Sequence, residues 1–443
     1  MASAAEQLAA NLNFGAFAKA DALKKRIWFT LGALIVYRLG TYIPLPGINP
    51  EALASAFNNQ QSGILGLFNM FSGGAVGRMA IFALGIMPYI SASIIIQLMT
   101  SIIPSLDALK KEGEAGRKII NQYTRYGTVL LAVVQAYGIS VGLEGGTNIV
   151  IDPGLFFRIT AVLTLTGGTM FLMWLGEQIT SRGIGNGISL IIFAGIVANL
   201  PHALAGMLDL SRQGALPAWV VLLVAIVAIA AILFIVFMER AQRRLIIQYP
   251  KRQVGNRMFQ GESSHLPLKL NTSGVIPPIF ASSLLLLPAT IANFSQGKGP
   301  GWFNSIVALL GHGTILYMAL YAAMIVFFAF FYTAIVFNPS DTADNLKKHG
   351  GFIPGIRPGQ RTAEYIDYVL TRITVLGAIY LVIVCLLPEF LISATHVPFY
   401  FGGTSLLIVV NVTMDTVSQV QGHLLAHQYE GLVKKSKLKG KRR

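Results

Sequence analysis

The sequence predicts an all-α polytopic membrane protein with ten transmembrane helices in two inverted five-helix halves. Only 12% of the 443 residues are charged, whereas a soluble domain carries roughly a quarter. Hydrophobic residues make up 54% of the chain, and no polar stretch is long enough to form a soluble domain of its own. The apolar residues fall instead into ten windows of membrane-spanning length.

These ten windows are predicted as transmembrane helices because a helix needs about 20 apolar residues to cross a bilayer. The first follows Lys24-Lys25-Arg26 and lacks a small-residue cleavage site, so we expect a retained span and not a signal peptide. The ninth contains the single cysteine, Cys385, which we expect to be a small core residue. The windows are residues 27–44, 79–103, 121–143, 155–176, 184–208, 216–238, 274–294, 314–337, 373–392 and 399–420.

Lysine and arginine are concentrated in every second connecting segment, and these segments all lie on the same side of the membrane. The segments before span 1 and after spans 2, 4, 6, 8 and 10 contain most of the 34 basic residues, while the other loops contain little beyond Arg158, Arg212 and Lys298. Cytoplasmic loops carry such an excess, so both termini are predicted to face the cytoplasm, which requires an even number of spans. Five spans in each half then force the halves to be inverted, an arrangement that commonly encloses a pathway.

Two of the basic loops are longer than a connector needs. Residues 239–271 interleave arginine with isoleucine, tyrosine and phenylalanine, and residues 338–372 contain the turn-forming PGIRPG around Arg357. Ordered loops with a basic face favour an acidic partner, either protein or RNA. The alternatives are a role in topology with attraction to anionic lipid, and a simple solvated charge at Arg357.

Isoleucine recurs at helical spacing in three spans. Taken alone, this periodicity is explained by core packing or by contact with lipid. Pro88 and Pro277-Pro278 are predicted to kink or break spans 2 and 7. Polar residues near these prolines favour faces toward other helices or water, so the two helices are predicted to form a seam that parts. The isoleucines are Ile86, Ile90 and Ile94 in span 2, Ile188, Ile192 and Ile196 in span 5, and Ile276 and Ile279 in span 7.

The sequence gives little support to catalysis. It contains neither the GxxxxGK[ST] nucleotide motif nor the HExxH metal motif, and its 7 histidines are scattered over loops and tail. We therefore predict no enzyme activity, no cofactor and no metal. Two other classes stay open: an inverted-repeat secondary transporter, although the spans lack an ionic site, and a membrane-embedded enzyme such as an intramembrane protease, although Asp415 has no evident partner.

A short apolar segment, SGILGLFNMFSGGAVG at residues 62–77, precedes span 2. Its continuous apolar part, residues 64–71, is about 12 Å long as a helix, which is too short to span a bilayer. Glycines flank it on both sides. Backbone that does not span is tolerated at membrane depth only inside protein or along a cavity. The segment is therefore either an interfacial half-helix or part of a protein-enclosed cavity.

Six long strings of residues are distinctive: FNMFSGGA, IFALGIMPYISASIIIQL, EGEAGRKIINQYTRYGT, MFLMWLGEQITSRGIGNGIS, FNPSDTADNLKKHGGFIPGIRPG and VPFYFGGTSLLIVV. Together they resemble the bacterial SecY family, whose members are the central subunit of the general protein-secretion channel. The similarity follows the family's order from about residue 20 to 420. One departure is Pro277-Pro278, where the family pattern has a single proline.

The resemblance implies a protein-conducting channel in the bacterial plasma (inner) membrane. Unfolded secretory polypeptides cross the membrane through it, and apolar helices leave it sideways into lipid. It implies a clamshell of two halves around a central pore, hinged between spans 5 and 6. The implied partners are the SecE and SecG subunits, the SecA ATPase, the ribosome with its RNA and proteins, signal sequences and nascent chains, and anionic lipids; no cofactor is implied.

The resemblance also implies roles for residues of this chain. The pore ring consists of Ile86, Ile90, Ile188, Ile192, Ile279 and Ile408. The plug, a short helix that closes the outer funnel, includes Ile64, Leu65, Leu67, Phe68, Met70, Phe71, Gly73 and Gly74. The lateral gate contains Ser91, Ser93, Gln97, Ser282, Ser283 and Leu287. The residues that dock SecA or the ribosome are Arg240, Arg243, Arg244, Lys251, Arg252, Lys347, Lys348 and Arg357.

With these assignments the chain is predicted to divide into five parts. A cytoplasmic N-terminal segment, residues 1–26, precedes the N-terminal half, residues 27–208, which contains the plug at 62–74. A hinge loop at 209–216 leads to the C-terminal half, residues 217–420, with its cytoplasmic loops at 239–271 and 338–372. A basic cytoplasmic tail at 421–443 follows.

Overall fold

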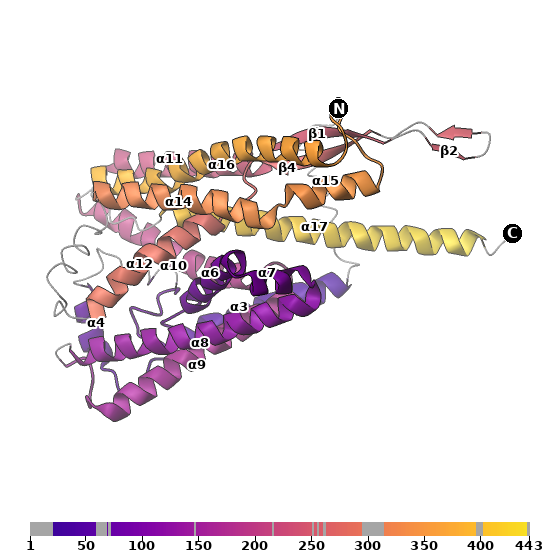
Figure 1. Cartoon of the computed structure of the whole chain (residues 1–443). Coiled ribbons are helices and arrows are strands. Elements are labelled where there is room, and N and C mark those ends of the chain that lie inside the picture. Colours follow the sequence, from indigo (N-terminus) through magenta and orange to yellow (C-terminus); the bar gives the residue numbers. More distant parts are fainter. Residues whose placement is uncertain are drawn as a thin grey trace.

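The computed structural model describes residues 21–58, 69, 72–145, 148–214, 217–249, 252–254, 257–259, 263–294, 314–395 and 402–440. Within these residues every predicted span overlaps a helix (Figure 1). The helices are α3 (Asp21–Gly40), α4 (Pro50–Asn58), α6 (Met87–Ile102), α7 (Pro104–Lys111), α8 (Glu114–Glu144), α9 (Leu155–Arg182), α10 (Gly187–Arg212), α11 (Ala218–Arg240), α12 (Ile276–Phe294), α14 (Ile315–Val336), α15 (Pro339–Lys348), α16 (Gln360–Thr395) and α17 (Gly403–Gly440).

Most of the predicted spans are recognisable from the helices alone. Among the described residues, 6 helices are long and apolar enough to cross a membrane, or 7 if the bent pair α6 and α7 counts as one span. The other three predicted spans correspond to α3, α12 and α17, which pack into the same bundle. The predicted tail continues span 10, because α17 runs on to Gly440.

The helices form two groups that meet along a central junction. Figure 1 shows α3, α8 and α9 on one side and α11, α14 and α16 on the other. The first group also includes α6 and α10, which pack on α8 and α9, and the second includes α12 and α17, which pack on α14 and α16. Contacts between α6 and α12 and between α10 and α17 join the groups. The largest buried apolar cluster lies at this junction and draws residues from both groups, including Cys385, which is buried as predicted.

Span 2 is only partly helical, and its proline has a different role from the one predicted. Residues 79–86 form turns, and α6 begins at Met87 with Pro88 in its first turn. Pro277 and Pro278 likewise fall in the first turn of α12. The first turn accepts proline because its N–H would have no partner inside the helix. The prolines therefore start these helices and do not kink them, while an unpredicted bend of 99° separates α6 from α7.

The turns before α6 are packed tightly between α3 and α9. The ring of Phe82 stacks on Tyr37 and on Phe171, with centroids 6.3 and 5.8 Å apart. A Cβ on Gly40 would collide with the ring of Phe82, and one on Gly168 would collide with the carbonyl oxygen of Ile81. The two glycines thus allow an irregular segment to lie between two helices.

We expect Gly168→Ala to lower the free energy of unfolding by about 1–3 kcal/mol, the usual effect of over-packing, because the methyl group would meet rigid backbone at Ile81. Gly167→Ala is the matched control, since no heavy atom lies within 4 Å of its added Cβ. Thermal unfolding of the purified protein in detergent, followed by circular dichroism, compares the two. Equal melting temperatures for both variants would show that the segment can yield.

The loop between α11 and α12 is a β-hairpin. Strand β1 (Gln242–Gln248) pairs antiparallel with β4 (Ser263–Lys269), and β2 (Arg252–Val254) pairs with β3 (Arg257–Phe259). Gln248 and Phe352 exchange two backbone hydrogen bonds, of 2.9 and 3.0 Å. These bonds join the two long basic loops into one structural unit. Its apolar core consists of Leu245, Leu268, Ile353, Ile366, Val369 and Ile373.

The loops alternate between two ends of the bundle, as the charge pattern predicts. The hairpin and the C-terminal part of α17 project from the same end (Figure 1). Leu23 and Ile184 pack together there, with Leu424 of α17 against them. Ile48 and Val150, from segments predicted on the opposite side, form a β-bridge with each other. Consecutive spans therefore run in opposite directions.

Candidate functional site

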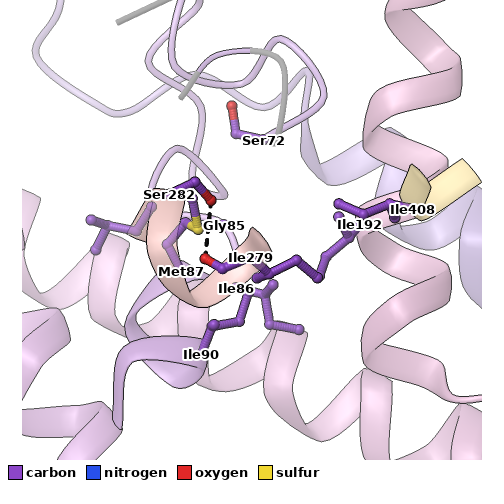
Figure 2. Close-up of a pocket in the computed structure, with 10 residues that line it drawn as sticks. Ser72, Gly85, Ile86, Met87, Ile90, Ile192, Ile279, Ser282 and Ile408 are labelled. Carbon is purple, nitrogen blue, oxygen red and sulfur yellow. Dashed lines mark hydrogen bonds between the residues drawn. The ribbon is translucent and has the colours of Figure 1, made fainter. Parts of the chain in front are cut away.

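Five isoleucines from the two groups of helices surround one small cavity (Figure 2). The cavity has a volume of about 10 Å³, close to the smallest space that holds a water molecule. The isoleucines are Ile86 and Ile90 at the start of α6, Ile192 in α10, Ile279 in α12 and Ile408 in α17. We call these five residues the isoleucine ring. Both groups of helices contribute to it, so a relative movement of the groups changes its width.

Local structure makes the lining of this cavity apolar. Ile86 is the residue before α6, and Ile90 follows one turn later, so both side chains lie on the same face. Ser282 also lines the cavity, but its hydroxyl donates a hydrogen bond of 3.0 Å to the carbonyl oxygen of Ile279 in its own helix (Figure 2). The polar group is therefore satisfied inside α12 and does not hold water in the cavity.

Ile188, the sixth predicted ring residue, is not among the residues that line the cavity. It lies one turn before Ile192 in α10, where its Cγ1 atom is 3.2 Å from the position of a Cβ on Gly176 of α9. Met87, Gly85 and Ser72 line the cavity although they were not predicted to. Helical spacing does not identify Ser72 and Gly85, because they lie in the turns that precede α6, and Met87 is only the first residue of that helix.

The predicted plug lies mostly outside the described residues, which include neither Ile64, Leu65, Leu67 and Phe68 nor Met70 and Phe71. Its end is described. Gly73 and Gly74 have φ angles of +69° and +84°, which glycine adopts readily. The carbonyl oxygen of Gly73 accepts hydrogen bonds from Arg38 Nη1 at 2.7 Å and from Arg78 Nη2 at 3.3 Å. This end of the segment therefore lies beside α3 and close to the cavity.

The predicted lateral-gate residues lie on α6 and α12, which pack against each other. Ser91, Ser282 and Ser283 are buried, and Ser93 and Gln97 are half-buried. Within the described part of the chain, Gln97 Oε1 and Ser283 Oγ are buried without a hydrogen-bond partner. Leu287 lies in α12, but its side chain is outside the described residues. Each of the two helices thus carries a buried polar atom that has no partner among the described residues.

The predicted docking residues lie on and beside the joined basic loops, which we call the basic platform (β1, β4 and residues 339–359). Six of the predicted docking residues are exposed in the part of the chain that the structure describes, and none of these six has a carboxylate within salt-bridge distance there. Lys251 and the side chain of Arg252 lie outside that part. The exposed residues are Arg240, Arg243, Arg244, Lys347, Lys348 and Arg357. Their cations face solvent at one end of the molecule.

Comparison with known proteins decides the family. The SecY family model matches residues 80–417. The protein translocase subunit SecY of Escherichia coli K12 is 58% identical over 422 residues, which cover 94% of this chain and 95% of that protein. The chain belongs to the SecY family. As a SecY-family protein it is a multi-pass membrane protein and a subunit of a protein-conducting channel.

Solved structures share the SecY-family fold. A protein-conducting channel superposes with a TM-score of 0.66 at 18% identity, covering 91% of this chain and 93% of that one. Sec61 in the canine ribosome–channel complex gives a TM-score of 0.63 at 17% identity, with the same coverage. The predicted ten-helix clamshell is therefore confirmed. The alternative of a secondary transporter finds no support among these SecY-family relatives.

Proposed function

We propose that this chain is the central channel of a bacterial plasma-membrane secretion complex. Unfolded secretory polypeptides would pass through the isoleucine ring, and apolar helices would leave sideways between α6 and α12. The observation that carries the proposal is the ring itself, in which isoleucines from both groups of helices close on a space of about 10 Å³. An apolar ring makes no specific hydrogen bonds to a passing chain, and it resists wetting when closed.

The seam between α6 and α12 supports sideways release. A buried polar atom without a partner costs about 1–3 kcal/mol, and Gln97 of α6 and Ser283 of α12 would each contribute one such atom to the closed seam. The closed seam is therefore weaker than an apolar contact of the same size. A signal sequence that offers α6 and α12 a new apolar surface would part them at a small energetic cost.

The end of the predicted plug supports a seal on the outer side of the ring. Ser72, near the end of the predicted plug, lines the same cavity as Ile86 and Ile90, so this end of the plug approaches the ring directly. Gly73 and Gly74, with their positive φ angles, would serve as the pivot on which residues 64–71 swing away.

The basic platform supports docking by a motor or a ribosome. Its exposed cations favour an acidic protein surface or RNA, so SecA and the ribosome are the proposed partners, with SecE and SecG as companion subunits and anionic lipids along the membrane face. The excess of basic residues at this end supports a cytoplasmic location for it and for both termini. The proposed hinge at 209–216 overlaps the end of α10, and the proposed halves are the groups on either side of it.

Reconstitution tests the proposal. The chain purified with SecE in liposomes is expected to transport a secretory precursor only when SecA and ATP are both present, because the ring offers a path but no source of energy. Protection of the precursor from added protease measures transport. Transport without a motor would contradict the proposal, and saturable uptake of a small solute by the protein alone would favour a secondary transporter.

A further inference from the structure

We propose that Glu239 is a positioning residue that couples the basic platform to the pore, so that a partner docked on the platform moves the gate helix and the ring. The inference rests on the proposed function, because it assumes a partner that docks there. Glu239 is an acidic residue near the end of a strongly apolar helix, where ionisable groups are rare and usually have a specific role.

One carboxylate oxygen of Glu239 joins three elements that are far apart in sequence. Its Oε1 accepts a hydrogen bond from Asn271 Nδ2 at 2.6 Å and another from Asn411 Nδ2 at 3.2 Å. Asn271 follows β4, Asn411 lies in α17, and only 4% and 8% of their respective surfaces are exposed. Hydrogen bonds from amides to a charged acceptor in such a buried place are stronger than the same bonds in water.

The same carboxylate links the two segments at which the hairpin begins and ends. Glu239 comes just before β1, and Asn271 comes just after β4. The backbone N–H of Leu270 donates to the carbonyl oxygen of Ala241 at 3.0 Å, which closes the hairpin at its base. A Cβ on Gly377 of α16 would lie 2.7 Å from the carbonyl oxygen of Leu270, so α16 holds this base closely. The platform is therefore fixed at its root and cannot tilt independently of Glu239.

From this point the connection continues to the ring and the gate. Asn271 Nδ2 also donates to the carbonyl oxygen of Gly274 at 3.0 Å, and Ser273 Oγ donates to Asn271 Oδ1 at 3.0 Å, just ahead of α12. Ile279 of the ring lies in the first turn of that helix. Asn411 is one turn after Ile408, another ring residue, in α17. A shift of the platform thus reaches two ring residues through one oxygen atom.

Glu239→Ala tests the coupling by separating docking from transport. In liposomes that contain this variant together with SecE, and with SecA and ATP added, we expect the maximal rate of precursor transport to fall about tenfold. The SecA concentration that gives half of the maximal rate should stay unchanged, because the exposed cations of the platform are intact. A platform that had merely lost its structure would instead raise that concentration.

Glu144→Ala is the matched control. Glu144 also holds two elements together, through Arg158 at 2.6 and 2.8 Å and the N–H of Gly154 at 3.1 Å, but at the end opposite the platform. We expect its melting temperature to fall with no change in the maximal rate. An equal loss of rate in both variants would overturn the coupling and leave only a general effect of instability.

Two more variants test the shared oxygen acceptor and the link to α17 separately. Glu239→Gln retains an oxygen acceptor in the same place and should keep most of the transport rate. If its rate fell as far as that of Glu239→Ala, the role of this oxygen as a shared hydrogen-bond acceptor would be refuted. Asn411→Ala removes one donor and leaves the hairpin base intact, so it tests the link to α17 even if Glu239→Ala fails to assemble with SecE. If wild-type liposomes transport and Glu239→Ala transports equally fast, the coupling alone fails; if the wild type does not transport, the proposed function fails.

Discussion

Ile90→Ser is expected to make the resting channel leak ions about tenfold faster or more. Ile90 is 8% exposed and lines the ring cavity. An apolar side chain of this size disfavours water by about 1.5–3 kcal/mol, and each 1.4 kcal/mol changes a population about tenfold. Serine removes most of that barrier and offers water a hydrogen-bond partner. Conductance of the purified complex in a planar bilayer, without SecA or precursor, measures the leak.

Ile94→Ser is the matched control for this substitution. Ile94 lies one turn further along α6 and is 4% exposed, but it is not among the residues that line the cavity. It should destabilise the protein by a similar amount and leave the conductance low. Equal leaks from the two variants would show that general loosening, and not the ring, opens the channel. The same recording on a chain without residues 64–71 separates the contribution of the plug from that of the ring.

Arg357→Glu is expected to reduce SecA-dependent export about tenfold or more, while binding of SecE persists. The tip around Arg357 is held by its backbone, since Thr362 Oγ1 donates to the carbonyl oxygen of Arg357 at 2.9 Å. The neighbouring Ile356 packs on the core of the basic platform, and the guanidinium is exposed. A hydrogen bond to a charged group contributes about 1.5–3 kcal/mol, and reversing the charge adds repulsion from an acidic partner. Export of a precursor into inverted membrane vesicles measures the effect.

Arg361→Glu provides the same charge reversal four residues later. Arg361 is the second residue of α16, its side chain is 79% exposed, and its Nη1 lies 4.0 Å from Glu364 Oε2. Export through this variant should stay close to that of the wild type. If both reversals reduced export equally, the net charge of the loop would explain the result and Arg357 would have no special part in docking.

Hydropathy predicted where the chain crosses the membrane, but not where each helix begins. The apolar window at 79–103 does not distinguish helix from buried turns, so the turns at 79–86 were missed. Those turns exist because Gly40 and Gly168 leave room for Phe82 and Ile81, and these contacts join residues that are far apart in the sequence. The prolines were noticed, but composition does not tell the first turn of a helix from its interior.

The candidate site was accessible from the sequence only in part. Helical spacing placed Ile86 and Ile90 on one face, and the family resemblance brought in Ile408, which no local pattern marks. Ile188 shows the limit of spacing, since it shares a face with Ile192 but lies one turn away from the cavity. Glu239 stands out in the sequence only as an acidic residue near the end of an apolar helix, and no local pattern identifies its partners, which are 32 and 172 residues away.

The first-turn prolines have an electrostatic consequence. Because α6 starts beside Ile86 and α12 starts one turn from Ile279, both helices direct their N-terminal ends toward the ring. A helix N-terminus is equivalent to roughly half of an elementary positive charge, and the start of α6 has no side-chain cap to offset it. If the ring is the passage proposed above, sodium ions and protons that approach it would meet a positive potential in addition to a narrow apolar constriction. The channel would then protect the membrane potential by charge as well as by shape, while an uncharged stretch of polypeptide would encounter only the shape.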